Sequence, residues 1–128
     1  MNGINISRAN LSKAQLVNAE LFYANLNNIN LNEADCTGIT LYRSNISFAN
    51  LSKANCSSAN FSKANMMFAD FSHGNFSGAN FAQANLKGVN FEGAYLSGVN
   101  LKGAELIQAD LEKALLTDAI MPDGSIHK

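Results

Sequence analysis

Proline, tryptophan and cysteine are scarce in this sequence of 128 residues, which has one proline, no tryptophan and two cysteines. One pair of cysteines is too few for a disulfide framework, and without a secretory signal at the start of the chain it indicates reduced thiols. No apolar run approaches the roughly 18 residues that a membrane span needs. We therefore expect a cytoplasmic protein without a membrane partner.

An excess of one charge is also missing, because nine Lys and Arg stand against ten Asp and Glu, for a net charge of −1. This balance gives no overall signal for binding nucleic acid or an anionic membrane. Residues 1–64 have a formal charge of +2 and residues 65–128 one of −3. The C-terminal half is thus mildly acidic, and nucleic acid is not an expected direct partner.

A five-residue repeat organises the chain. Every fifth residue from Ile6 to Met121 is Leu, Ile, Phe, Met or Cys, at all 24 of these centres. The residue two places before a centre is usually Ala, and the residue between them is usually Asn or Asp. A period of five fits neither a helix nor a long strand, so each unit must contain its own turn.

Each unit is expected to form one wall of a coil. Its Ala-Asn-Leu stretch alternates inward and outward as a short strand would, and the next two residues form a corner. Glycine recurs at the second corner position, which favours a turn with positive φ; these glycines are Gly38, Gly78, Gly88, Gly93, Gly98 and Gly103. Stacking of alike residues, such as Cys36 over Cys56 and Phe61 over Phe81, favours a twenty-residue coil over a fifteen-residue one.

The units resemble those of the pentapeptide repeat family, whose pattern is A(D/N)LXX. Matching units are ANLSK at 9–13 and 49–53, ANFSK at 59–63, ANLKG at 84–88 and ADLEK at 109–113. The resemblance covers nearly the whole chain and implies an all-β fold, a right-handed quadrilateral parallel β-helix of about six coils. We expect the β-helix at 1–114 and a C-terminal capping segment at 115–128, similar to the tails of small cyanobacterial members.

The outward Asn residues have two possible roles. They can hydrogen-bond from coil to coil, or they can cap backbone groups at the corners. One column of them consists of Asn5, Asn25, Asn45, Asn65 and Asn85.

Cysteine, histidine and the N-x-S sequons can indicate redox, metal or glycosylation sites, but each has a simpler explanation in this sequence. Cys36 and Cys56 stand at core centres, so we interpret them as small hydrophobic residues rather than as a redox pair or metal ligands. His73 and His127 have no ligand set around them, and seven N-x-S sequons merely restate the repeat. No phosphate loop, dinucleotide fingerprint or nucleophile elbow occurs. We expect no enzymatic activity, cofactor, metal or small-molecule substrate.

Large apolar side chains at outward positions are the main departure from the repeat, which normally has Ser, Asn or Lys there. They gather at two successive corners that bracket one face, and they form a candidate protein-interaction patch: Phe22, Tyr23, Tyr42, Phe48, Met67 and Phe68. Isolated exposed apolar residues are normal on protein surfaces, so an incidental cluster is the alternative.

Three functions are compatible with these observations. The leading prediction is a non-enzymatic scaffold that acts through contact with a protein partner or through self-association. The resemblance also implies a DNA-mimic modulator of DNA gyrase, although such members are strongly acidic and this chain is nearly neutral. A regulatory binding protein is the third possibility, and it rests on the resemblance alone.

Overall fold

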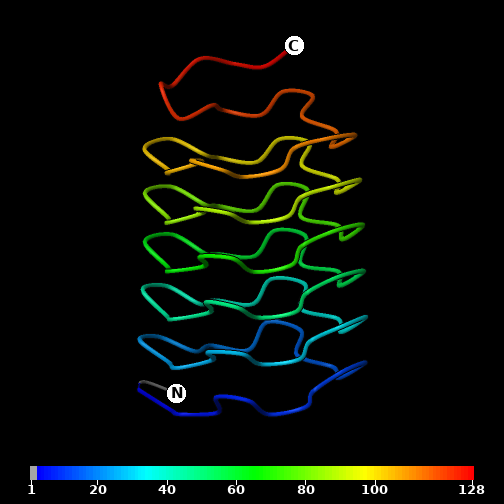
Figure 1. Cartoon of the computed structure of the whole chain (residues 1–128), viewed down its shortest axis with the longest axis vertical. Helices are drawn as coiled ribbons and strands as arrows, with labels where there is room; N and C mark the ends of the chain where they lie inside the picture. The colour runs from blue at the N-terminus through cyan, green and yellow to red at the C-terminus, as the bar shows by residue number, and fades with distance from the viewer. Residues whose placement is uncertain (1–2) are drawn as a thin grey trace.

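The chain winds into a stack of coils along one axis, with its ends at opposite ends of the stack (Figure 1). The computed structural model describes residues 3–128. Parallel bridges connect residues that are twenty positions apart, from Asn5 with Asn25 to Asn100 with Ile120. One coil therefore holds twenty residues, or four five-residue units, and the predicted twenty-residue register is confirmed. The architecture is a parallel β-helix.

Strand pairing is limited to one residue in each unit. Every fifth residue from Asn5 to Ile120 forms an isolated bridge, and residues 3–128 contain no helix and no longer strand. The bridged residues are the Asn and Asp of the repeat and the residues that replace them. Because each coil pairs with the coils on both sides, pairing is nevertheless continuous along the stack.

All five backbone N–H groups of a regular unit find an acceptor, as residues 50–54 illustrate. Asn50 donates to Ile29 O at 2.9 Å in the preceding coil, and Leu51 donates to Asp70 O at 2.7 Å in the following one. The N–H of residue 53 donates to residue 72 at 2.9 Å, and that of residue 54 closes the turn at 3.1 Å onto the carbonyl of residue 51. The remaining N–H, at Ser52, has no backbone acceptor and depends on a side chain.

The Asn side chain supplies that missing acceptor. Asn50 Oδ1 accepts from Ser52 N at 2.9 Å and from Ser52 Oγ at 2.6 Å. The same backbone bond is found at Asp70, whose Oδ1 accepts from Ser72 N at 3.0 Å. Of the two roles predicted for these residues, corner capping is confirmed. Its physical basis is that an unpaired backbone donor is costly, so an acceptor is favoured at this position of the repeat.

Removal of one such acceptor should destabilise the protein measurably. Asn50→Ala is expected to lower the free energy of unfolding by about 1 kcal/mol, the usual effect of losing a side-chain cap. Asn50→Asp keeps the acceptor, as Asp70 does naturally, and should be close to wild type. Urea unfolding followed by circular dichroism would measure both variants. Equal stability of the Ala and Asp variants would contradict the capping role.

The corners adopt the left-handed conformation at their second residue. Six glycines predicted at this position have φ between 66° and 72°. Non-glycine residues adopt the same conformation elsewhere, including Tyr23 at 55°, Phe48 at 59° and Phe68 at 58°. Bulky residues rarely have positive φ, but here the geometry belongs to the repeat as a whole rather than to one strained site.

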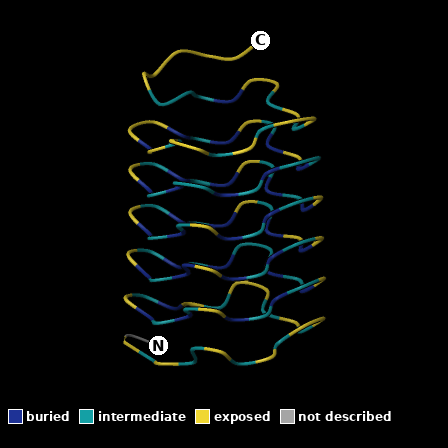
Figure 2. Ribbon diagram, viewed as in Figure 1, coloured by how far each residue is buried: buried dark blue, intermediate teal, exposed yellow. Residues whose placement is uncertain are grey.

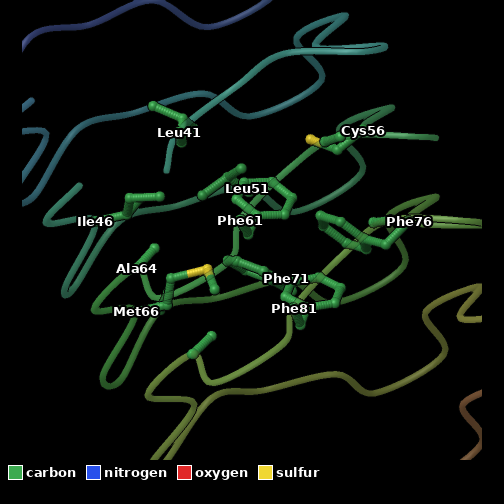
Figure 3. Packing of buried hydrophobic residues seen from close by; sticks show 14 of the residues in the cluster. Leu41, Ile46, Leu51, Cys56, Phe61, Ala64, Met66, Phe71, Phe76 and Phe81 are labelled. Carbon is green, nitrogen blue, oxygen red and sulfur yellow. The ribbon is translucent and has the colours of Figure 1, made fainter. Parts of the chain in front are cut away.

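The inside of the coils is filled by the centres of the units, and buried residues line it along the middle of the stack (Figure 2). Its largest feature is a cluster of phenylalanine rings, of which four are seen packed together in Figure 3. Phe71 and Phe76 stack at 4.6 Å between ring centroids, and Phe61 and Phe81 at 5.1 Å. The predicted stacking of Phe61 over Phe81 is confirmed.

The C-terminal tail doubles back along the last coil. Ile126 forms an antiparallel bridge with Ile120, and the N–H of His127 donates to Ala119 O at 2.8 Å. Within the predicted capping segment 115–128, Leu115 and Ile120 still bridge to the preceding coil, so the repeat extends into this segment. Centres Leu106, Leu111 and Leu116 in the last coil are half-buried, whereas the centres in the middle of the stack are buried.

Candidate protein-interaction surface

The six residues of the predicted patch lie at the two corners that flank one face of the coils. We call this region, residues 22–28, 42–48 and 62–68, the aromatic face. Tyr23, Phe48 and Phe68 are exposed to 56%, 57% and 44%. The other three are half-buried: Phe22, Tyr42 and Met67. Exposure is therefore concentrated at the second residue of each corner, where the positive φ directs the side chain outward.

One corner carries a phenylalanine stack. The rings of Phe48 and Phe68 lie 5.5 Å apart at an angle of 20°, as expected for residues one twenty-residue coil apart. The next residue in this column is Gly88. A Cβ atom at that position would clash with Phe68 Cδ1 and Cε1. The absence of a side chain at Gly88 therefore leaves the space that the Phe68 ring occupies.

The other corner combines aromatic and cationic side chains. Tyr23 and Tyr42 meet edge to face with their centroids 6.1 Å apart. Arg43 Nε donates to the Tyr42 hydroxyl oxygen at 3.1 Å, and the guanidinium carbon lies 5.5 Å from the centre of that ring. The hydrogen bond lowers the pKa of Tyr42, and the charges of Arg43 and Lys63 lower it further. The same bond raises the pKa of Arg43.

Sequence reasoning did not include Arg43 and Lys63 in the patch, although the signal was available. Arg43 follows Tyr42 directly, and the twenty-residue register places Lys63 at the same corner, one coil further along. The three segments of the aromatic face contain these two cations and no Asp or Glu. The surface is thus both aromatic and basic, whereas the sequence-based prediction considered its apolar residues alone.

A buried serine shapes the corner that carries Phe22 and Tyr23. Ser44 occupies the small-residue position of its unit and is 1% exposed. Its hydroxyl accepts from Ala24 N at 3.0 Å and donates to Leu21 O at 2.9 Å. In regular units the fourth residue of the turn donates directly to the first, as Ala54 does to Leu51 at 3.1 Å. The Ser44 hydroxyl is inserted into the 21–24 turn instead.

The two cysteines lie in the core, and the part of the chain that the structure describes contains no pocket or metal site. Cys36 and Cys56 are fully buried, and burial raises the pKa of the Cys56 thiol well above its usual value. Their interpretation as core residues is consistent with this placement. Residues 3–128 enclose no pocket and bring together no group of three or more His, Cys, Asp or Glu that could hold a metal.

The described residues also contain no helix long and apolar enough to cross a membrane.

Five-residue units, a twenty-residue coil and a side-chain cap at the corners define a repeat protein of the β-helical solenoid class. The family model for pentapeptide repeats matches in eight copies, over residues 1–38, 19–55, 40–78, 64–103 and 94–123. The chain therefore belongs to the pentapeptide repeat family, whose members form right-handed β-helices. No curated protein matches the chain.

Solved structures of the same family are similar over most of the chain. The pentapeptide repeat protein Rfr23 from the cyanobacterium Cyanothece 51142 is 27% identical, with a TM-score of 0.61 over 89% of this chain and 81% of that one. The plasmid-mediated fluoroquinolone resistance protein QnrB1 is 15% identical, with a TM-score of 0.75 over 94% and 74%. A pentapeptide repeat protein from the Arabidopsis thaliana thylakoid lumen is 23% identical, with a TM-score of 0.62 over 95% and 70%.

Proposed function

We propose that this chain is a non-enzymatic scaffold whose aromatic face binds a protein partner or a second copy of the chain. The observation that carries the proposal is the clustering of Tyr23, Phe48 and Phe68, all exposed, on a face where regular units have small polar residues. Exposed apolar surface with aromatic and Arg side chains is typical of interaction sites. Pentapeptide repeat proteins are generally structural or binding proteins, which is in keeping with this role.

The framework in this proposal is a right-handed quadrilateral β-helix of about six coils, with residues 115–128 as its C-terminal cap. The twenty-residue register supports four walls per coil, and the antiparallel bridge between Ile120 and Ile126 supports the cap. We also place the protein in the cytoplasm, since both cysteines are free thiols.

Rigidity of the face supports a binding role. Each aromatic residue of the patch is anchored at a corner whose neighbouring backbone groups are hydrogen-bonded to adjacent coils; the N–H of Phe48, for example, donates to Met67 O at 2.9 Å. A surface that is ordered before association loses little conformational entropy when it binds. The stacked pair Phe48–Phe68 is thus a preorganised apolar contact.

The proposal is tested by replacing three patch residues together, Tyr42, Phe48 and Phe68, with Ser. We expect the β-type circular dichroism spectrum to be retained, because none of the three is a core centre, and binding of a partner or of a second copy to be lost. A control variant, Val17→Ser, removes an exposed apolar residue outside the patch. The control should bind as the wild type does. Unchanged binding by the triple variant would contradict the assignment of the aromatic face as the binding site.

Gyrase modulation by DNA mimicry is not part of this proposal. A mimic of DNA needs a strongly acidic surface overall, whereas nine cations nearly balance ten acids in this chain, for a net charge of −1. The similarity to QnrB1, at 15% identity, concerns the fold alone. No observation on this chain favours a particular regulatory partner either.

A further inference from the structure

The twenty-residue register separates the charges of the chain onto different sides of the rod, although the net charge is only −1. The basic side consists of the segments that stack in line with the aromatic face: 3–8, 22–28, 42–48, 62–68, 82–88 and 102–108. Its formal charge is +4, from five cations and one acid: Arg8, Arg43, Lys63, Lys87 and Lys102, with Glu105. The aromatic patch lies in the middle of this side.

The opposite side of the rod is acidic. It lies two units further round the four-unit coil and consists of 12–18, 32–38, 52–58, 72–78, 92–98 and 112–118. Three cations and five acids give it a formal charge of −2: Lys13, Lys53 and Lys113, with Glu33, Asp35, Glu92, Glu112 and Asp118. Three of the five acids fall in the last two coils, so the acidity is greatest towards the C-terminal end.

Exposed apolar residues accompany these C-terminal acids. Tyr95 and Leu115 replace the usual Asn or Asp, bridge to one another in adjacent coils, and are exposed to 51% and 50%. We call the acids and apolar residues of this region the acidic patch: Glu92, Tyr95, Glu112, Leu115 and Asp118. The rod therefore has an aromatic-basic surface on one side and an apolar-acidic surface on the other.

We propose that the aromatic face of one copy binds the acidic patch of a second copy. The inference rests on the proposed function and names the partner of that surface. Arg43 and Lys63 meet carboxylates of the second copy, while the exposed rings cover Tyr95 and Leu115. Both surfaces combine apolar residues with charge, and the two charges are opposite, which is the complementarity that aligns and selects partners.

Assembly through these surfaces is open-ended. The two patches differ and lie on opposite sides of the rod, so each copy keeps one free patch after the first contact. Contacts of this heterologous kind build chains rather than closed dimers unless a rotation closes the ring. They are also offset along the axis, because the aromatic patch precedes the acidic patch by several coils (Figure 1). We expect association that increases with protein concentration and decreases with salt.

Charge reversal tests the inference. One variant is Arg43→Glu with Lys63→Glu, and the other is Glu92→Lys with Glu112→Lys and Asp118→Lys. In sedimentation velocity at about 50 mM salt, each alone should associate at least about tenfold more weakly than the wild type. An equimolar mixture should associate again, because the reversed aromatic face of one variant then meets the reversed acidic patch of the other, and their two native surfaces meet as well, with opposite charges in both contacts. Arg8→Glu with Lys102→Glu is the matched control, since it makes the same charge change on the basic side away from the patch.

Each outcome decides the inference. Association of the wild type that is lost in both variants and regained in the mixture supports it. A wild type that stays monomeric up to about 1 mM at low salt, or variants that associate normally, would overturn it. If a reversed variant misfolds, Arg43→Gln with Lys63→Gln provides the same test at reduced charge. The two proposals can also be told apart. If the wild type stays monomeric but binds another protein, and the Tyr42, Phe48 and Phe68 triple variant loses that binding, the proposed function stands and this inference fails.

Discussion

Replacement of Phe71 by Ala is expected to lower the free energy of unfolding by about 3–5 kcal/mol. Phe71 is fully buried and lies at the centre of the ring cluster (Figure 3). Four other rings surround it, at centroid distances of 6.0, 4.6, 6.2 and 5.4 Å; they are Phe61, Phe76, Phe81 and Phe91. Loss of the Phe71 ring therefore removes contacts with all four at once.

The large effect depends on how poorly this site can collapse. Phe71 follows Asp70, which bridges to Asn50 on one side and to Asn90 on the other. These bridges set the separation of three consecutive coils, so the backbone cannot close around the lost ring and a cavity remains. The cost of a large-to-small change rises with the cavity that is left.

Urea unfolding measures the effect, and Phe48→Ala is the matched control. Phe48 has the same side chain but is mostly exposed, so its replacement should cost about 1 kcal/mol or less. Similar losses for Phe71 and Phe48 would contradict the assignment of inside and outside positions.

The core and the register could be predicted from the sequence because a strict period links them. An apolar centre at every fifth residue requires a turn in each unit, and equal turns require equal coils. The coil length then follows from stacking, since a spacing of twenty residues places Phe61 over Phe81 and Cys36 over Cys56. Both pairs lie in the core. Prediction succeeded here because local pattern and long-range pairing depend on the same spacing.

The surface was harder to predict. Which side chains are exposed depends on the backbone φ angle at the corners, and which side chains cluster depends on neighbours in adjacent coils. Tyr42 and Phe48 both stand at outward corner positions in the repeat, but only Phe48, at the position with positive φ, is exposed. The basic character of the aromatic face was hidden by a net charge close to zero. Arg43 and Lys63 become one cluster only when the register places their coils in contact.

Gly74 is another position at which the repeat pattern alone leads to a wrong expectation, namely that Ala would fit there. It occupies the small-residue position that holds Ala in most units, including Ala54 and Ala94 in the adjacent coils. A Cβ atom at Gly74 would lie 2.6 Å from Phe76 Cε2 and 3.1 Å from Ala54 O. The Phe76 ring therefore occupies the space that the Ala methyl group fills elsewhere. Gly74→Ala restores the family pattern yet should destabilise the protein.

Two opposing effects determine the size of that loss. Replacing Gly by Ala restricts the unfolded chain and stabilises a protein by about 0.4–1 kcal/mol where the backbone conformation permits. Overpacking of a core costs about 1–3 kcal/mol, and here the methyl group meets a ring and a backbone carbonyl oxygen that bridges hold in place. The clash outweighs the entropic gain, so we expect a net loss of about 1–2 kcal/mol in urea unfolding.

A double variant separates packing from backbone effects. Phe76→Leu removes the ring atoms that the Ala methyl group would meet, at the cost of stacking with Phe71. Because the clash requires both the methyl group and the ring, Gly74→Ala should cost less in the Phe76→Leu background than in the wild type, and it should even stabilise that variant slightly. An equal loss in both backgrounds would mean that the clash is with Ala54 O rather than with the ring. A Gly74→Ala protein more stable than the wild type would mean that the core has room for the consensus residue after all.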